Sequence, residues 1–565
     1  MKNLKSLTQS RKLKYGTLNL ILIAFVIAIV ITLNSIVSVL GDTFGWYIDM
    51  TEEELYSVSD ELIALLDEVS DDAPIDIIFC CDKDEAEGNY TDAATGTGSA
   101  MAYIHSTAVQ IADRLDNVSI LYKDPIKDHV FIDKFTKAQG QVSPNEAAII
   151  VARRNENGDY GTMYRTYYAT SFYTFTSDAG GTNTLYGYSG ERTFATAILS
   201  LSYDKAPTVY FVWGHSENVP YSNANGDYNV PELARVFIDC GFRVRQLFLD
   251  DEEKQFTCTT QGCGETWGQK EIGEMTDFVC ECGTKYNPKA DGEEMFTEKR
   301  VIPTDARAII INDPKSDYGA NELSKLSDYL ISKKGTLMCF TNPKSNAPLD
   351  NLNKFIKQET GVTVVEGDYV THKDTVTQGQ LYDFKGVIAD TDAAGVYLNS
   401  LQGYGSKRPM FKNSGVLKID EAFMSDEAIS DVLADRITQP IIQTDKNAQL
   451  GEEKNQFNVL SVTALTTIYN NQPTQSYFMV CPSVEFVSDE YLSNSMYANE
   501  DILLALIHST TAAKVPVDLD FKEFANYQLD ISSSQATTVF VCLITILPAL
   551  AIGTGVVIIV RRKHR

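Results

Sequence analysis

The sequence is poor in the residues and motifs that mark common catalytic sites. It contains six histidines, and none stands in the H-E-x-x-H or H-x-x-E-H patterns that place two imidazoles at a catalytic zinc ion. It also lacks the G-x-x-x-x-G-K-[ST] loop whose backbone amides hold nucleotide phosphates. These absences exclude a histidine-based metallohydrolase of those types and a P-loop ATPase.

Positive charge is scarce outside the two ends of the chain. Of the 48 Lys and Arg residues, nine lie in short terminal tails, at Lys2, Lys5, Arg11, Lys12, Lys14, Arg561, Arg562, Lys563 and Arg565. The remainder carries 39 basic against 76 acidic residues, a net charge of −37. A body of this charge repels nucleic acid and anionic lipid head groups.

Two long apolar runs lie beside these tails. Residues 18–40 contain no charged residue, and as a helix they would extend about 34 Å, enough for a hydrocarbon core of about 30 Å. Residues 539–560 repeat this feature, and Pro548, Gly553 and Gly555 within them are tolerated in membrane helices. A cleaved signal peptide is the alternative for the first run. However, signal peptides have a shorter apolar region and end in a small-x-small cleavage site, which this sequence does not provide after the run. We therefore expect two transmembrane helices.

The basic tails set the expected orientation, because Lys and Arg concentrate on the cytoplasmic side of membrane spans. Both tails, residues 1–17 and 561–565, should lie in the cytoplasm. The main body should be extracytoplasmic and should reach the second helix through a membrane-proximal linker, residues 521–538. The protein is thus predicted to reside in the cell membrane.

Residues 41–205 alternate between helical and strand-like patterns. Apolar residues at helical spacing predict an amphipathic helix within 55–69, and a β-branched run at 75–80 predicts the first strand. Further patterns predict helices at 102–115 and 191–202 and strands at 118–123, 147–152 and within 162–176. This β-α-β then β-β-α order is typical of a small thioredoxin-like domain.

Two adjacent cysteines, Cys80 and Cys81, follow the first strand of this predicted domain. A thioredoxin-type redox site needs C-x-x-C spacing at a helix start, so that one thiolate is stabilised and the other resolves the mixed disulfide. Adjacent cysteines do not provide this spacing. We interpret them as structural residues that pack as small apolar side chains.

Residues 206–520 form the second predicted domain. Strands are expected at 208–213, 243–249, 306–312, 336–341 and 362–369, with helices at 231–240, 320–333 and 349–360. Strands that alternate with helices of about 10 to 15 residues predict a parallel, doubly wound sheet. A late strand at 475–484 and a helix at 498–511 close the domain, and the pattern leaves 370–445 unassigned.

A cysteine-rich segment, residues 251–300, interrupts this alternation. Its four cysteines, Cys258, Cys263, Cys280 and Cys282, are spaced C-x4-C-x16-C-x-C. Two close thiolate pairs separated by a hairpin-sized loop suit tetrahedral Zn²⁺, and resemble a zinc ribbon except that both pairs there are C-x2-C. Two disulfides are the alternative, which an extracytoplasmic location permits. We expect a structural Zn²⁺, because four protein ligands leave no open position for a substrate.

The loop after the strand at 208–213 contains Gly214, His215, Ser216 and Glu217. Loops at the carboxyl ends of strands in open α/β sheets bind ligands. A G-x-S-x-G nucleophile turn would require glycine where the sequence has Asn218, and the next predicted helix is delayed. We therefore predict no catalytic residues, and we regard the four loop residues as candidates for contact with a ligand or partner.

Four segments, in this order, resemble the GldG family, auxiliary subunits of ABC-type transporters first associated with gliding motility. They are IDMTEEELYSVSDELIALLDEV, GERTFATAILSLSYDKAPTVYFVWGHSEN, VIPTDARAIIINDPKSDYGANELSKLSDYLISKKGTLMCFTNP and FMVCPSVEFVSDEYLSNSMYANEDILLALIHS. The resemblance covers most of residues 49–513. It implies a thioredoxin-like domain followed by a glutamine-amidotransferase-like or flavodoxin-like domain, without established catalysis.

The resemblance also implies partners, namely a membrane permease and a cytoplasmic ATPase encoded by other genes. Two features depart from the family. The loop usually reads GHGE, where residues 214–217 read GHSE, and the cysteine-rich segment is not a general family feature.

We therefore expect a non-enzymatic, membrane-anchored auxiliary subunit of an ABC-type transporter complex, with an extracytoplasmic region that binds a substrate or partner. It should contact the permease, the ATPase and membrane lipid, but no nucleic acid. The alternatives are a cell-surface hydrolase that uses the loop at 214–217, or an envelope-binding module independent of a transporter.

Overall fold

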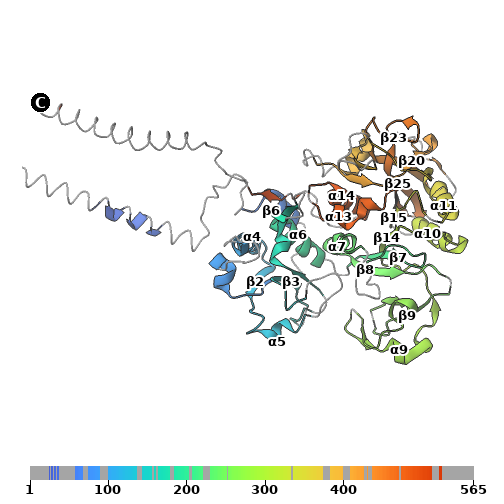
Figure 1. Cartoon of the computed structure of the whole chain (residues 1–565). Coiled ribbons are helices and arrows are strands. Elements are labelled where there is room, and N and C mark those ends of the chain that lie inside the picture. The colour runs from blue at the N-terminus through green and yellow to red at the C-terminus, as the bar shows by residue number, and fades with distance from the viewer. Residues whose placement is uncertain are drawn as a thin grey trace, which may run out of the picture. The chain divides into compact units, whose positions relative to one another are not determined.

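A computed structural model gives the arrangement of the chain (Figure 1). It describes residues 25, 27–29, 31–33, 35–36, 57–67, 74–89, 100–135, 143–155, 158–160, 163–177, 183–202, 206–220, 230–250, 252–261, 263–280, 282–332, 335–345, 347–372, 382–398, 407–424, 429–430, 435–469, 472–494, 496–511, 519, 521–524 and 561. The chain divides into two compact units, Met1–Lys522 and Glu523–Arg565.

The predicted membrane spans fall largely outside this description. The span at 539–560 lies outside the described residues, as do the linker at 525–538 and most of the span at 18–40. Within the residues described, no helix is both long enough and apolar enough to cross a membrane.

The first α/β part of this unit is built on a sheet of four strands in the order β2-β1-β3-β4. The strands are β1 (Ile75–Phe79), β2 (Val118–Tyr122), β3 (Ile149–Arg153) and β4 (Tyr164–Tyr167). β1 runs parallel to β2 and antiparallel to β3, and β3 runs antiparallel to β4. Every residue of β1 is buried.

Four helices accompany this sheet in the described residues; three lie where the sequence predicted helices, and the short one at His129–Ile132 was not predicted. They are α3 (Asp60–Leu66), α4 (Ala100–Arg114), α5 (His129–Ile132) and α6 (Gly190–Leu201). A hairpin of β5 (Tyr173–Ser177) and β6 (Asn183–Tyr188) precedes α6. The succession of helices and strands expected for this part is confirmed, with ends shifted by a few residues except for α3, which covers only the middle of the predicted helix.

Cys80 and Cys81 follow β1 and are both half-buried. Burial raises the pKa of each thiol to about 12, with further contributions from Cys81 for Cys80 and from nearby carboxylates for Cys81. A thiol with so high a pKa carries almost no nucleophilic thiolate at neutral pH. This fits the interpretation of the two cysteines as structural residues.

A buried carboxylate joins the segment before α3 to Lys522 at the end of the first unit. Glu191, 4% exposed at the start of α6, accepts hydrogen bonds from the backbone N–H and the hydroxyl of Ser59. It also lies 2.6 Å from the ammonium of Lys522, which in turn donates to the backbone carbonyl of Ser57. We call Ser57, Ser59, Glu191 and Lys522 the terminal clasp, because the segments before α3 and at Lys522 meet at one carboxylate.

The second α/β part is built on an eleven-stranded sheet. Its parallel half consists of β26 (Gln472–Cys481), β15 (Thr336–Phe340), β14 (Ala306–Asn312), β7 (Thr208–Val212) and β8 (Arg243–Leu247), in that order. Adjacent strands within this half are parallel. The predicted doubly wound pattern describes this half.

The other half is antiparallel, so the predicted parallel sheet accounts for only part of the observed one. Its strands are β25 (Asn458–Tyr469), β20 (Val416–Ile419), β16 (Val362–Val365), β22 (Asp435–Gln443), β18 (Val387–Ile388) and β21 (Ile429–Ser430). β25 pairs antiparallel with β26, because only two residues separate them and so short a connection cannot cross over to a parallel partner. Segment 370–445, which the sequence pattern left unassigned, supplies four of these strands.

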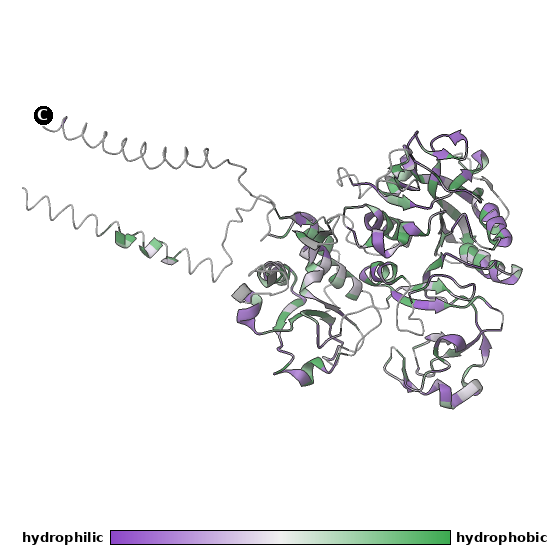
Figure 2. Ribbon diagram, viewed as in Figure 1, coloured by the Kyte–Doolittle hydropathy of each residue, from purple (hydrophilic) through white to green (hydrophobic). Residues whose placement is uncertain are grey.

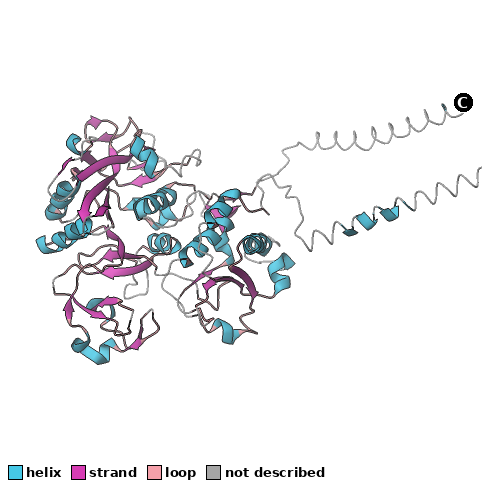
Figure 3. Ribbon diagram, turned by 180° about the vertical axis from the view of Figure 1, so that it is seen from behind, coloured by secondary structure: helices cyan, strands magenta, loops and turns pink. Residues whose placement is uncertain are grey.

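Helices cover both faces of this sheet. α7 (Pro231–Asp239) and α14 (Asn499–Thr511) pack on one face, and α10 (Ala320–Ser332) and α11 (Asp350–Thr360) on the other. Along β7, Val209 and Phe211 face the first pair, while Tyr210 and Val212 face the second. Figures 2 and 3 show apolar residues along the strands and helices on either side. A strand buried on both faces reads as an unbroken apolar run, as β7 does.

Smaller elements complete this part. They are β17 (Asp383–Lys385), β19 (Met410–Lys412), β23 (Gln449–Leu450), β24 (Glu453–Lys454), α12 (Asp392–Tyr397) and α13 (Asp489–Leu492). β17 pairs with β19, and β23 pairs with β24.

The cysteine-rich segment forms its own small lobe after β8. It contains β9 (Lys254–Thr257), β10 (Thr266–Gly268), β11 (Phe278–Val279), β12 (Lys285–Tyr286), β13 (Glu298–Lys299), α8 (Gln269–Ile272) and α9 (Pro288–Asp291). Two arginines tie the lobe to β8. Arg245 of β8 pairs with Glu271 at 3.2 Å and lies over the ring of Trp267 at 3.6 Å. Arg300 donates to the backbone carbonyl of Gln246 at 2.9 Å.

Candidate functional site

Four parallel strands of the large sheet end at the same level. Asn312 at the end of β14 is in register with Phe340 of β15, and Phe340 is in register with Cys481 of β26. β7 lies beside β14 in the same direction. The residues that follow these strands therefore meet along one edge of the sheet, the position at which open α/β sheets bind ligands.

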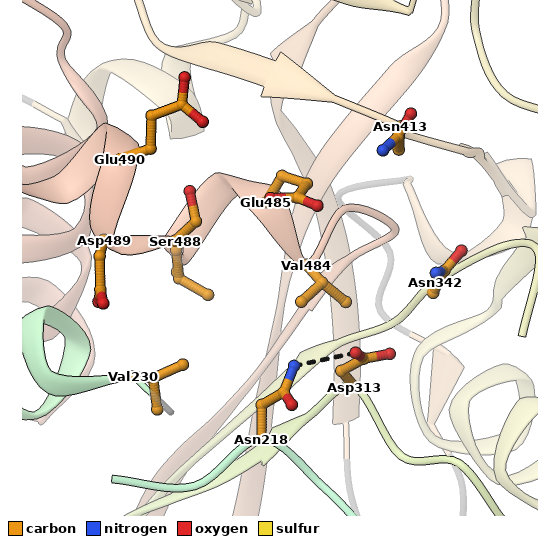
Figure 4. A pocket seen from close by; sticks show the side chains of 11 residues that line it. Asn218, Val230, Asp313, Asn342, Asn413, Val484, Glu485, Ser488, Asp489 and Glu490 are labelled. Carbon is orange, nitrogen blue, oxygen red and sulfur yellow. Dashed lines mark hydrogen bonds between the residues drawn. The ribbon is translucent and has the colours of Figure 1, made fainter. Parts of the chain in front are cut away.

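A pocket of about 360 Å³ lies at this edge (Figure 4). Its walls come from the segments that follow β7, β14, β15, β19 and β26, together with the residue before α7. The lining residues are Asn218, Val230, Asp313, Asn342, Asn413, Val484, Glu485, Val487, Ser488, Asp489 and Glu490. Eight of these eleven side chains are polar or acidic, so the pocket offers hydrogen-bonding groups more than apolar surface.

Asp313 is the best-fixed side chain of the pocket. It follows β14 directly, is 6% exposed, and its Oδ2 accepts a hydrogen bond from the side-chain amide of Asn218 at 2.9 Å. Lys315 pairs with the same oxygen. The other oxygen, Oδ1, is buried and has no hydrogen-bond partner among the described residues. The hydroxyl of Ser488 is likewise buried and without a partner in the described part of the chain.

The backbone around the pocket is held in an uncommon conformation at two points. Asp313 has φ 56° and Asn413 has φ 51°, both in the left-handed region. Asp and Asn enter that region more readily than other non-glycine residues. Among the described non-glycine residues one more has positive φ, Ser216 at 58°, and it lies after β7 on the same edge.

The acidic side chains at the pocket influence one another. The pKa of Glu485 is raised, first by burial and also by Glu490 and Asp313, while Lys412 acts in the opposite direction. The pKa of Asp489 is raised by burial, although its carboxylate accepts the backbone N–H of Glu232 at 3.1 Å and so caps α7. Burial therefore makes the charged forms of Glu485 and Asp489 less favourable.

The loop predicted as a contact site, residues 214–217, is organised around Glu217. The side chain of Glu217 is fully buried. Its Oε2 accepts the backbone N–H groups of Gly214 and His215 at 3.1 and 2.7 Å, and its Oε1 accepts the hydroxyl of Tyr318 at 2.6 Å. Gly214 has φ 149°, which side-chain-bearing residues rarely adopt. Glu217 thus closes the turn that Gly214 begins.

His215 lies between two carboxylates. Its Nδ1 is 3.4 Å from Glu217 Oε1, its Nε2 is 3.2 Å from Glu322 Oε2, and its ring stacks on Tyr318 with centroids 4.0 Å apart. Burial lowers the pKa of His215, but the neighbouring carboxylates of Glu217 and Glu322 outweigh burial and raise it to about 9. The ring is therefore an imidazolium at neutral pH.

The pocket and the predicted loop are adjacent but distinct. None of Gly214, His215, Ser216 and Glu217 lines the pocket, whereas Asn218, the next residue, does. Ser216 is exposed. Among the pocket residues that sequence reasoning did not select, Asp313, Asn342 and Glu485 each follow a buried strand within four residues, and that position was the available signal.

The four predicted metal ligands lie together in the cysteine-rich lobe. The sulfur atoms of Cys258, Cys263, Cys280 and Cys282 lie within 4.8 Å of one another. The sulfurs of Cys258 and Cys282 are 3.6 Å apart, and those of Cys263 and Cys280 are 3.5 Å apart. These cysteines form the one such group of possible metal ligands in the described residues.

Two backbone turns present these sulfurs. The N–H of Cys258 donates to Glu265 and that of Cys280 to Thr284, so each pair sits at a narrow hairpin. Gly264 and Gly283 have φ of 66° and 85°, a left-handed conformation that glycine adopts readily. Beneath them, Phe256, Ile272, Phe278 and Phe296 form a small apolar core with Cys258 and Cys280. The cluster therefore has two buried members, Cys258 and Cys280, that pack on this core, while Cys282 is exposed.

Comparisons with known proteins give little further guidance. No protein-family model and no curated protein matches the sequence. A solved structure described as "mmIFT52 N-terminal domain" is similar over 54% of this chain and 97% of its own, with 12% identical residues and a TM-score of 0.32. A similarity of that size indicates neither a shared function nor a shared fold.

Proposed function

We propose that this chain is a non-enzymatic, membrane-anchored auxiliary subunit of an ABC-type transport complex, and that its outer α/β part binds a ligand or partner at the carboxyl edge of the large sheet. The observation that carries the proposal is the pocket at that edge, with fixed polar side chains from the ends of parallel strands. The sequence resemblance to the GldG family supplies the transporter context.

The chemistry of this edge favours binding over catalysis. The lining residues of the pocket include no histidine, cysteine or lysine that could serve as a strong base or nucleophile. His215 nearby has both ring nitrogens beside carboxylates, and with a pKa of about 9 only about 1% of it would be neutral at pH 7. A histidine must be neutral to act as a general base.

The terminal clasp supports anchoring at both ends. Ser59 lies shortly after the first predicted span, and Lys522 shortly before the second. Because both contact Glu191, the two connecting segments start from one place on the first unit. Neighbouring starting points for the two connecting segments are compatible with two helices in one membrane.

The strand orders support the finer fold assignment. In the first part, the β-α-β and β-β-α units share a sheet of order β2-β1-β3-β4, an arrangement that suits a thioredoxin-like domain. In the second part, parallel strands covered by helices on both faces suit a flavodoxin-like or glutamine-amidotransferase-like domain. Both assignments agree with the domain order that the GldG resemblance implies.

We include a structural Zn²⁺ in this proposal. In a tetrahedral site with Zn–S bonds of about 2.3 Å, the sulfurs lie about 3.8 Å apart, close to the 3.5 and 3.6 Å separations found here. Cys258, Cys263, Cys280 and Cys282 would hold the ion and leave no position for a substrate, so the ion would stabilise the lobe. Elemental analysis should find about one zinc per chain; metal-free protein whose four sulfurs become reactive only after reduction would establish disulfides instead.

Co-purification tests the transporter assignment. The full-length chain, tagged and extracted from its native membrane in a mild detergent, should retain a permease and an ATPase at comparable amounts. Recovery of the chain alone would refute the assignment and would favour an envelope-binding module that acts without a transporter.

A hydrolase that uses the loop at 214–217 is the second candidate, favoured by one observation. Ser216 is exposed and has φ 58°, and strained turns of this kind present nucleophilic serines in α/β-hydrolases. Acyl and glycosyl substrates should be tested with the full-length chain and with Ser216→Ala. Turnover that the substitution abolishes would establish this candidate, whereas equal turnover in both would remove Ser216 from it.

A further inference from the structure

The pocket at the sheet edge has an excess of negative charge and of hydrogen-bond acceptors. We propose that it binds a small organic cation, a primary amine that also carries hydroxyl or other polar groups. This deepens the proposed function of the same edge, since it names the chemical class of the ligand that the binding subunit would hold.

The first argument is charge. Four carboxylates line the pocket, those of Asp313, Glu485, Asp489 and Glu490. Two lysines lie close to them: Lys315 pairs with Asp313, and Lys412 is 3.8 Å from Glu490. The four carboxyl groups outnumber the two lysines, which leaves two acidic groups in excess. A positively charged ligand would balance them, and an anion would be repelled.

The second argument is the unused acceptor on Asp313. Asp313 is more than nine-tenths buried and lines the pocket, yet its Oδ1 has no partner among the described residues. A buried carboxylate oxygen without a partner costs free energy. An ammonium group has three N–H donors and no acceptor, so it satisfies this oxygen and could reach a second carboxylate as well. The buried hydroxyl of Ser488 offers one further partner.

The third argument separates an organic cation from a metal ion. Among the described residues, only the cysteine cluster brings three or more candidate metal ligands together, with ligand atoms within 4.8 Å of one another. The carboxylates of the pocket form no such group. The pocket carboxylates are thus spread around a space and do not converge on a point. The volume of about 360 Å³ falls within the range of about 300–1,000 Å³ that small-molecule sites occupy.

The remaining polar side chains indicate what else the ligand carries. Asn218, Asn342 and Asn413 each present a side-chain amide at the pocket wall (Figure 4). Amides both donate and accept hydrogen bonds, which suits hydroxyl groups on the ligand. Val230, Val484 and Val487 supply the apolar part of the wall, against which a short carbon skeleton can pack.

The state of Glu485 agrees with this assignment. Burial and the neighbouring Glu490 and Asp313 raise its pKa, so its carboxylate form is disfavoured in the empty pocket. A bound ammonium group would favour the carboxylate form, because an opposite charge nearby stabilises it.

Ligand-observed NMR on the full-length chain in detergent tests the proposal. The probes are 1,4-diaminobutane and glucosamine, each paired with its neutral counterpart, 1,4-butanediol and glucose. We expect at least one amine to bind and its neutral counterpart to bind at least tenfold more weakly. Glu485→Gln should weaken the amine about tenfold or more, because it removes a charge-assisted contact.

Two further variants control for folding and for bulk charge. Glu490 is exposed, so Glu490→Gln should fold normally and still weaken the amine. Glu274, whose side chain is 93% exposed in the cysteine-rich lobe, supplies Glu274→Gln, which makes the same charge change away from the pocket and should leave binding unchanged. Thermal unfolding confirms that each variant is folded.

Three results would overturn the proposal. The first is that neither amine binds at concentrations up to about 10 mM, which is ten times the concentration that half-saturates a millimolar site. The second is that a neutral counterpart binds as well as its amine, and the third is that both pocket variants bind the amine as well as Glu274→Gln does. Because binding is measured on the isolated chain, these results are independent of co-purification. A failed titration would leave the transporter assignment standing, and failed co-purification would leave the amine site standing.

Discussion

The charge state of His215 gives a pH dependence that can be worked out from its contacts. Its pKa is raised from an ordinary value of about 6.5 to about 9, because Glu217 and Glu322 offset the effect of burial. When folding raises the pKa of a group, the group stabilises the folded state fully at pH values below its pKa in the unfolded chain. This contribution is lost as the pH rises through its pKa in the folded protein. His215 should therefore stabilise the protein fully below about pH 6.5 and lose this contribution by about pH 9.

The size of the effect follows from the shift. At 1.36 kcal/mol per pKa unit, the contribution is about 3 kcal/mol. The side chain of His215 is only 14% exposed, so solvent should reduce this figure little. With an unfolding entropy of about 2.1 cal/mol/K per residue over about 300 residues, it corresponds to about 5 °C in the unfolding midpoint.

The assay compares the wild-type chain with His215→Phe by thermal unfolding between pH 6 and pH 9.5. Phenylalanine keeps the ring that stacks on Tyr318 but removes the charge. The wild type should be the more stable at pH 6, and its advantage should shrink by about 5 °C at pH 9.5. His129 is exposed on α5, so the matched control His129→Asn should show no such change. An advantage that stays constant across this range would refute the assigned charge state.

Three further perturbations test other parts of the structure. Cys280 is fully buried in the cysteine cluster, so Cys280→Ser should reduce bound zinc from about one per chain to almost none and lower the unfolding midpoint, as elemental analysis and calorimetry would show. Arg300→Met should destabilise the lobe by about 3–5 kcal/mol, because it leaves the fully buried Glu253 without its cation. Adding Glu253→Gln should recover part of this loss. If the effects of the two substitutions on the free energy of unfolding simply add, the pairing is contradicted. Lys522→Met removes the cation from Glu191, and should cost about 1–3 kcal/mol and speed proteolysis around Ser57; an unchanged cleavage rate would argue against the terminal clasp.

The sequence predicted most elements of the parallel half of the large sheet, for a physical reason. Strands buried on both faces, such as β7 and β14, appear as continuous apolar runs that end abruptly in polar residues. Helices such as α10 show apolar residues at helical spacing. Both signals are local, so a single sequence is enough to read them.

The antiparallel half could not be predicted in this way, because its pairing depends on contacts distant in sequence. β16 pairs with β20 more than fifty residues later, and β22 pairs with β25. Thr438 and Thr463 hydrogen-bond to each other in the buried interior of this half. Polar residues of that kind weaken the apolar pattern on which strand prediction depends.

The candidate sites divide along the same line. The cysteine cluster was predictable, because two local pairs and two glycines mark both turns. The pocket was only partly predictable. Asp313 and Asn342 follow apolar strands that the sequence pattern reveals, but Asn413 comes from a segment without a clear pattern. The exact register of β14, β15 and β26 brings these residues to one level, and register does not follow from one sequence.

The contact between Arg300 and the backbone of Gln246 has a consequence for solubility. β8 is the last strand on its side of the large sheet, among the strands described, so its outer backbone groups have no neighbouring strand. Such an exposed edge is a template on which another chain can add a strand and begin to aggregate. The guanidinium of Arg300 donates a hydrogen bond to one of these backbone carbonyls, that of Gln246. The cysteine-rich lobe holds Arg300 in this position. If the lobe holds the proposed Zn²⁺, we expect that removing the ion would expose this edge of the large sheet and that self-association would precede unfolding of the sheet itself.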